Sequence, residues 1–241
     1  MDKRHFDELI QLENTYWWHV AKRQLAVDLL QTYFPPPGRL VEAGIGSARN
    51  LLAFQELGYH VTGLDIAPEA VDRGHQCGLH DIRQHDVCSP WPIEGESSRV
   101  AVMLDVLEHV ADPVQVLRYA AATLEPGGGL VITVPAYPQL YGDWDRRLGH
   151  VRRYTRRQFR SQAAEAGLSV VWTGHWNAFT LPAALVSRGL DRLLRRDRPP
   201  LFPRVTPSVN RLLLGCARVE RWFLYRVGIP FGLSIVGVLK K

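Results

Sequence analysis

The stretch Leu40-Val41-Glu42-Ala43-Gly44-Ile45-Gly46-Ser47-Ala48 predicts the fold of this chain. It is typical of a buried strand that runs into a Gly-x-Gly turn, with an acidic residue two positions before the first glycine. Asp65 follows 21 residues after Gly44 and ends a second apolar run. Glycines let a backbone approach a ligand closely, and a carboxylate after the next strand can hold both hydroxyls of a ribose. The pattern therefore predicts a nucleotide site.

The spacing of this turn separates two classes of nucleotide. A dinucleotide fingerprint would place its third glycine at position 49, where this chain has Arg49, which is too bulky for close helix–strand packing. The pattern from Glu42 to Ala48 is E-x-G-x-G-x-A, which lacks a strong pyrophosphate cradle and adds an acid that can meet an amino group. It favours adenosine attached to an amino acid, and it argues against a nicotinamide enzyme.

Length and composition are those of a globular protein. The chain has 241 residues, of which 46% are apolar and 22% charged, so one domain with an insertion is expected. The three cysteines are an odd number without a C-x-x-C pair, so neither a disulfide framework nor a metal site is predicted, and a cytoplasmic location is the simplest. We find no signal-peptide pattern and no apolar run of the ~18 residues that a membrane span needs.

Strand and helix patterns alternate along the first two thirds of the chain. The alternation predicts βαβ units, hence an α/β fold with a doubly wound, mostly parallel sheet that binds its ligand at the carboxyl ends of the strands. The expected strands are residues 39–43, 60–65, 82–86, 100–104, 130–134 and 168–173. The expected helices are residues 20–34, 47–58, one from Pro68, one from Pro113 and one from Thr155 to Ala166.

The end of the chain departs from this alternation. Residues 182–196 and 208–227 each show an apolar stripe at helical spacing, and residues 232–239 form a closing strand pattern. We therefore expect a seventh strand, separated from the sixth by a helical insertion of about 179–228. The predicted organisation is a helical cap over residues 1–34 and one domain over residues 35–241.

The charge is unevenly placed along the chain. Residues 146–226 contain 17 arginines, no lysine and four acids, a net charge of +13, whereas the remainder has a net charge of −8. Such asymmetry indicates either an anionic partner or a solvated surface. Arginine without lysine favours phosphate contacts, because guanidinium groups bind phosphate in a bidentate manner.

Over residues 35–175 the chain resembles the class I S-adenosylmethionine (SAM) dependent methyltransferases. Residues 42–48 are similar to the first motif of that family, and Asp65 matches its ribose acid. Four further segments carry the resemblance: residues 84–87 after the third strand, the L-E-H segment within residues 104–110, the Pro-Gly-Gly turn within residues 124–128, and the substrate-side loop at residues 148–155. Glu42 stands where Asp is usual, and Ala48 where the third glycine is usual. Residues 13–18 and 229–232 resemble bacterial members of uncertain substrate.

The resemblance implies a Rossmann-like fold with seven strands and SAM as the cofactor. It places the ribose on Asp65 and the adenine amine beside Asp86. The full set of residues expected around the cofactor is Trp18, Arg23, Glu42, Gly44, Gly46, Asp65, Ile66, Asp86, Val87 and Asp105. An aromatic N-terminal lid is one interpretation of Trp18, because a sulfonium cation is stabilised by an aromatic face; packing on the sheet is the other.

The expected reaction is methyl transfer from SAM to a small-molecule or lipid-linked acceptor, with oxygen as the preferred atom. An oxygen acceptor needs a base, and His150 is the candidate because imidazole titrates near neutral pH; the alternative is a structural histidine. Residues expected to shape the acceptor pocket are Tyr137, Tyr141, Asp145 and Tyr154. Glu108 and His109 are expected to cap or pack the start of a helix rather than to act as acid and base.

Three other interpretations remain open at the level of sequence. The arginine-rich half is compatible with an RNA-modifying methyltransferase, although residues 105–108 lack the Asn- or Asp-Pro-Pro-Tyr segment of amino-methylating enzymes. A non-catalytic SAM-binding module is a second interpretation. A third concerns the insertion, whose apolar stripes and arginines suit docking on an anionic membrane surface, packing on the sheet, or a homodimer interface.

Overall fold

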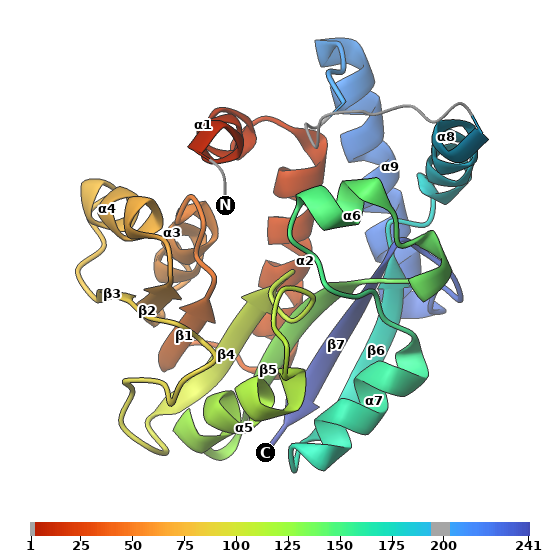
Figure 1. Cartoon of the computed structure of the whole chain (residues 1–241). Helices are drawn as coiled ribbons and strands as arrows, with labels where there is room; N and C mark the ends of the chain where they lie inside the picture. Colours follow the sequence, from red (N-terminus) through yellow and green to blue (C-terminus); the bar gives the residue numbers. More distant parts are fainter. Residues whose placement is uncertain (1–2, 194–202) are drawn as a thin grey trace.

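The computed structural model describes residues 3–193 and 203–241, with side chains from Phe6 to Gly189 and from Pro203 onward. A seven-stranded sheet has the order β3-β2-β1-β4-β5-β7-β6 (Figure 1). Its strands are β1 Arg39–Ala43, β2 His60–Asp65, β3 Ile82–Gln84, β4 Ser98–Leu104, β5 Leu124–Pro135, β6 Ser169–Trp176 and β7 Ser234–Lys240. The helices are α1 Lys3–Leu12, α2 Trp17–Tyr33, α3 Arg49–Glu56, α4 Pro68–Gln76, α5 Pro113–Thr123, α6 Asp143–Arg147, α7 Arg156–Glu165, α8 Leu181–Leu193 and α9 Pro207–Arg226.

The sheet is parallel from β3 to β5, and β7 runs antiparallel between β5 and β6. The prediction of a mostly parallel, doubly wound sheet with seven strands is therefore confirmed. β1 lies inside the sheet and pairs with both β2 and β4. From β1 the chain continues to one side through β2 and β3 and then returns to the other side of β1 with β4, so the direction in which strands are added reverses between β1 and β4. Ligands of such sheets bind beyond the carboxyl ends of the strands at this reversal.

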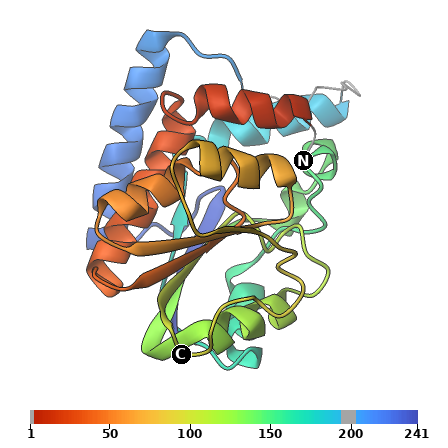
Figure 2. The ribbon, with the colours of Figure 1, turned by 90° about the vertical axis from the view of Figure 1, so that its left-hand side faces the viewer.

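Two apolar cores lie on opposite faces of the sheet. Side chains of α2, α3 and α9 pack with one face, and side chains of α5 and α7 pack with the other. Figure 2 shows these two groups of helices on the two sides of the sheet. The strands β1, β4 and β5 are buried on both sides, so they read as continuous apolar runs rather than as alternating patterns. This burial fixes the carboxyl ends of β1 and β4 rigidly beside one another.

Local signals explain where the helices begin. Asp112 accepts a hydrogen bond from the Gln115 backbone N–H ahead of Pro113, so α5 starts where the sequence predicts. Thr155 and Gln158 form the predicted capping box of α7. The short helix α6 was not predicted, because five residues are too few to show a helical period.

Helices α8 and α9 lie between β6 and β7 in the chain. Helix α9 packs one face against α2 and β6: Leu224 is buried in the core, and Arg221 forms an ion pair of 2.7 Å with Asp28. The Glu220 carboxylate accepts a hydrogen bond from the Ala178 backbone N–H. The sequence stripe that was expected for residues 194–196 lies outside the described residues. No helix in the described part of the chain is long and apolar enough to cross a membrane.

Candidate active site

The turn after β1 needs its glycines for steric reasons. Gly44 and Gly46 have φ angles of +78° and +52°, in the left-handed region that disfavours other residues. A Cβ at Gly44 would lie 2.7 Å from Cγ2 of Val106, so the turn after β1 and the turn after β4 touch. A larger residue at position 44 would therefore clash with the turn after β4.

Asp65 ends β2 and holds this turn in place. Its carboxylate oxygens accept hydrogen bonds from the backbone N–H groups of Gly46 (3.0 Å) and Ala67 (2.9 Å). Burial raises the pKa of Asp65, and these backbone hydrogen bonds oppose the rise. Each oxygen keeps a further lone pair, so the carboxylate can also accept the two hydroxyls of a ribose.

Glu42 is the buried acid of the site. The residue is only 1% exposed, and its Oε2 atom has no hydrogen-bond partner among the described residues. Burial is the main cause that raises its pKa to about 8, opposed by the amide of Asn50 at 3.4 Å and by Lys22. A buried carboxylate with an unused oxygen fits the ammonium group of an amino acid, which would stabilise the charged form.

We expect Glu42→Gln to change how the stability of the ligand-free protein depends on pH. The folded state holds the Glu42 proton up to a pH of about 8, whereas the unfolded chain loses it near 4.5, so stability falls as the pH rises between these values. The Gln variant lacks this loss. Thermal denaturation should therefore show the variant more stable than the wild type at pH 8.5 and equal to it near pH 4.5. If the difference in stability between Glu42→Gln and the wild type were the same at pH 8.5 and at pH 4.5, the raised pKa of Glu42 would be contradicted.

The N-terminal segment covers the glycine turn. A Cβ at Gly46 would lie 3.2 Å from Cδ2 of Leu9, so α1 packs directly over the turn (Figure 2). The guanidinium of Arg73 pairs with the buried Glu13 carboxylate at 3.3 Å, and Arg23 donates to the Glu13 carbonyl oxygen at 3.1 Å. Arg23 of α2 is thus held against Glu13 in the N-terminal segment, and its pKa is lowered by burial and by the nearby Arg49.

A charged pair lies at the carboxyl end of β4. The Lys22 ammonium donates to Asp105 Oδ2 at 2.9 Å and stands 4.0 Å from the centre of the Trp18 ring. Asp105 has a φ of +60°, and its Oδ1 accepts from the Thr133 hydroxyl at 2.8 Å. Burial alone would raise the pKa of Asp105, but Lys22 and Thr133 hold it below its usual value. Trp18 is partly buried and also contacts Trp176, so it belongs to the wall of this space.

The residues expected near the adenine follow β2 and β3. Ile66 is 63% exposed just after Asp65, an unusual position for a large apolar side chain. Asp86 is exposed and accepts a hydrogen bond from the Cys88 backbone N–H, whereas Val87 packs on the core. Ile66, Asp86 and Val87 therefore follow the carboxyl ends of β2 and β3, the same end of the sheet as Asp65. The exposed side chain of Ile66 is available to cover the flat ring of an adenine.

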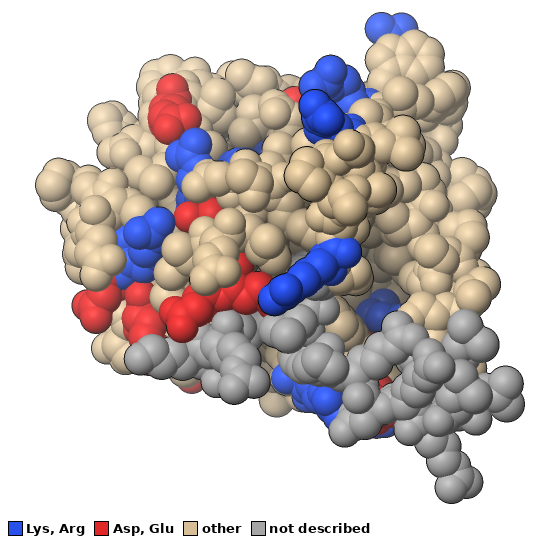
Figure 3. All heavy atoms as spheres, turned by 90° about the horizontal axis from the view of Figure 1, so that it is seen from above, with Lys and Arg blue, Asp and Glu red and all other residues tan. Residues whose placement is uncertain are grey.

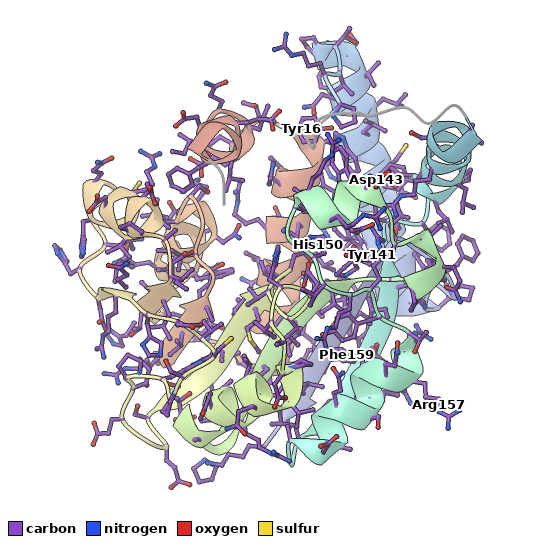
Figure 4. All side chains as sticks on the ribbon, viewed as in Figure 1. Tyr16, Tyr141, Asp143, His150, Arg157 and Phe159 are labelled. Carbon is purple, nitrogen blue, oxygen red and sulfur yellow. The ribbon has the colours of Figure 1, made fainter. Side chains whose placement is uncertain are left out.

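His150 lies on the other side of Asp105. Its side chain, labelled in Figure 4, is 11% exposed. Its Nδ1 is 3.2 Å from Oδ1 of the fully buried Asp145. Asp145 is fixed by the guanidinium groups of Arg153 at 2.7 Å and Arg188 at 3.3 Å. These contacts hold the pKa of Asp145 below its usual value although burial opposes them. An imidazole so oriented turns its Nε2 toward the turn after β4.

Glu108 and His109 meet His150 at this turn. The sequence prediction that they begin a helix is wrong, because α5 begins at Pro113 and the two residues lie in the preceding turn. Glu108 is fully buried, yet neither carboxylate oxygen has a hydrogen-bond partner in the described chain. Burial and Asp105 raise its pKa well above the usual value. Oε1 of Glu108 is 3.9 Å from Nε2 of His150, and the rings of His109 and His150 meet edge to face at 4.8 Å.

The tyrosines expected to contact an acceptor take different positions. Tyr154 is 1% exposed and donates to the Leu107 carbonyl oxygen, so it supports the turn after β4 from within the core. Tyr141 donates to the His150 carbonyl oxygen at 2.8 Å, and Tyr137 stacks on His175. Asp145 positions His150 rather than a substrate, because its oxygens are already engaged. The sequence places Tyr137, Tyr141, Asp145 and Tyr154 on one loop region, but it does not show in which direction each side chain points.

This sheet, with a glycine turn at its reversal and an acid ready for a ribose one strand away, is that of a class I SAM-dependent methyltransferase, and SAM is its cofactor. The chain belongs to the family described as a methyltransferase domain, whose model matches residues 17–172. The expected class of enzyme is therefore confirmed.

Relatives and solved structures agree with this class. The chain is similar to a ubiquinone biosynthesis O-methyltransferase from Xanthomonas campestris, with 33% identity over 141 residues, covering 53% of this chain and 59% of that enzyme. The match thus spans about three fifths of the relative's length. A Thermotoga maritima structure, described as a possible histamine N-methyltransferase, superposes with a TM-score of 0.65 at 15% identity, covering 99% and 95% of the two chains. A methyltransferase from Haloferax volcanii gives 0.63 at 22% identity, covering 100% and 98%. These two likenesses show the fold alone.

Proposed function

We propose that this enzyme transfers the methyl group of SAM to a hydroxyl oxygen of a small, lipid-linked acceptor. The observation that carries the proposal is the buried Asp145–His150 pair beside Asp105, at the end of the sheet where the methionine part of the cofactor belongs. A hydroxyl must lose its proton as its oxygen accepts the methyl group, and His150 is the residue we assign to this activation. The similarity to ubiquinone biosynthesis O-methyltransferases supports an oxygen acceptor.

The chain's own residues supply positioning and charge. The Gly44–Gly46 turn and Asp65 hold the nucleoside, Glu42 faces an ammonium group, and Lys22 keeps Asp105 ionised. SAM supplies an electrophilic methyl on a sulfonium. Holding the methyl and the acceptor oxygen in line at contact distance removes much of the barrier to transfer. The sulfonium becomes a neutral thioether, so the negative charge of Asp105 favours the bound donor over the product.

The insertion connects this site to the surface. Arg188 of α8 donates to the Leu140 carbonyl oxygen and to Asp145. These hydrogen bonds connect α8 to the loop that carries His150. Helix α9 keeps a second, apolar face uncovered in the described structure. Its exposed members are Val209, Leu212, Val219, Trp222 and Phe223, and Val227 follows just beyond the helix. Arg211, Arg218 and Arg226 are exposed on the same helix, with Arg226 over the Trp222 ring.

An exposed apolar stripe flanked by arginines suits the interface of an anionic membrane, from which a lipid-linked acceptor can reach the site. Nucleic acid is a less suitable partner. Figure 3 shows that the described part of the face above the strands carries acidic as well as basic side chains. Binding along a phosphate backbone needs a continuous positive surface instead.

We expect the protein to co-sediment with vesicles of anionic phospholipid at low salt and to release them at high salt. The double variant Trp222→Ser, Phe223→Ser should lose this binding, because it removes two exposed apolar anchors from α9. The control Val171→Ser changes an exposed apolar residue on β6 and should bind as the wild type does. Equal sedimentation of wild type and double variant would contradict docking through α9.

A further inference from the structure

Two imidazoles and one carboxylate converge beside the proposed acceptor. Glu108, His109 and His150 each offer one ligand atom, and these atoms all lie within 4.8 Å of one another. The three residues come from the turn after β4 and from the loop after α6, so the fold, not the local sequence, brings them together. Sites with two histidines and one carboxylate hold divalent first-row metals and leave coordination positions open.

The surroundings of both histidines match those of metal ligands. A ligating imidazole usually donates its other N–H to a carboxylate or a backbone carbonyl. Here Nδ1 of His150 is 3.2 Å from the Asp145 carboxylate, and Nδ1 of His109 is 3.2 Å from the Gly149 carbonyl oxygen. Each ring that donates from Nδ1 keeps the lone pair of its Nε2 for a cation.

Glu108 gives a second, independent indication of a ligand. It is 0% exposed, and both of its carboxylate oxygens lack a hydrogen-bond partner among the described residues. A buried carboxylate without partners is costly, and a bound cation would satisfy it. His109 is exposed on its outer side, which leaves a path for the cation to enter.

We propose that Glu108, His109 and His150 form a binding site for a divalent first-row metal cation, for which Zn²⁺ is the probe. The inference deepens the proposed function and rests on it for its role. A cation held here would draw electron density from the acceptor hydroxyl and release its proton to solvent. The oxygen–methyl bond then forms as the sulfur–methyl bond breaks, with the electron pair passing to sulfur. His150 would then activate the hydroxyl by holding the cation and would not itself take the proton, so this inference changes the role of His150 and keeps the reaction.

The test is binding of Zn²⁺ to metal-stripped protein, measured by calorimetry and by metal content after dialysis. We expect one Zn²⁺ per chain. His109→Asn keeps the donor to the Gly149 carbonyl but removes Nε2, and Glu108→Gln is nearly isosteric. Each should weaken Zn²⁺ affinity by more than the roughly 10–100-fold that loss of an outer-shell partner costs. His60→Asn, at the exposed start of β2, is the matched control and should bind as the wild type does.

Thermal melting and SAM binding show whether each variant is folded. No Zn²⁺ bound to the wild type, or equal affinity in the cluster variants and the control, would overturn the metal site. Methyl transfer by metal-stripped protein in the presence of a chelator, at the full rate, would also overturn it while leaving the proposed function intact. If the wild-type protein binds Zn²⁺ at the cluster but transfers no methyl group to any hydroxyl-bearing acceptor, the proposed function is refuted instead.

Discussion

Replacing His150 by alanine is expected to lower kcat by about 10²–10⁴-fold while leaving SAM affinity within about twofold of the wild type. The magnitude is that of a lost proton-transfer group. His150 lies near enough to Asp105 to interact with its charge, and its only carboxylate partners at contact distance in the described chain are Asp145 and Glu108. Steady-state kinetics at saturating acceptor and calorimetry with S-adenosylhomocysteine measure the two quantities separately.

His60→Ala provides the matched control for this variant. His60 is an exposed histidine at the start of β2, at the opposite end of the strand from the site. The control should keep its turnover. A His150→Ala protein that melts normally and keeps nearly full kcat would show that His150 has only a structural role.

Asp65→Ala is expected to weaken SAM binding by about 10- to 150-fold, the equivalent of about 1.5–3 kcal/mol for hydrogen bonds to a charged group. We place the ribose hydroxyls on this carboxylate, which already accepts hydrogen bonds from the Gly46 and Ala67 backbone N–H groups. Calorimetry measures the affinity. The wild type should also bind SAM more tightly than NAD, because the turn lacks a pyrophosphate cradle.

Asp72→Ala is the control for this effect, since Asp72 is an exposed acid on the neighbouring helix α4. Its SAM affinity should equal that of the wild type. Equal affinities of the Asp65→Ala and wild-type proteins, or equal binding of NAD and SAM by the wild type, would remove the basis for placing the ribose at Asp65.

The sheet could be predicted because its determinants are local. The bounds of β1 and β2 agree with the sequence pattern, since each strand is a short apolar run closed by a glycine or an acid. β5 is longer than predicted: it begins at Leu124, so the Pro-Gly-Gly segment that was expected as a turn lies within the strand. Leu124 pairs with Ser98 and Gly129 with Val100, so residues 125–128 form a bulge between these two pairs and the regular ladder starts at Gly129. A Cβ at Gly129 would lie 2.1 Å from the Leu239 carbonyl oxygen, so only glycine allows β7 to pair so closely there.

The site was only partly predictable. The positions of Gly44, Gly46 and Asp65 follow from spacing, because neighbouring parallel strands end at the same edge of the sheet. The cluster of Glu108, His109 and His150 does not, because His150 is far from the other two in the chain and meets them only when residues 145–154 fold back onto the turn after β4. The hydrogen bond from the Val151 backbone N–H to the Glu108 carbonyl oxygen makes this contact. The burial of Tyr154 could not be predicted either, because the sequence gives no signal of which way the ring of a loop tyrosine points.

Transfer of a deuterated methyl group from SAM tests the central proposal most directly. The purified protein is incubated with methyl-deuterated SAM and with lipid and small-molecule extracts, and the products are analysed by mass spectrometry with assignment of the methylated atom. We expect a deuterated methyl ether in the lipid fraction, formed together with S-adenosylhomocysteine, and its loss with the His150→Ala variant. Label found only on nitrogen or on nucleic acid, or an O-methylated product formed equally by the His150→Ala variant, would contradict the proposal.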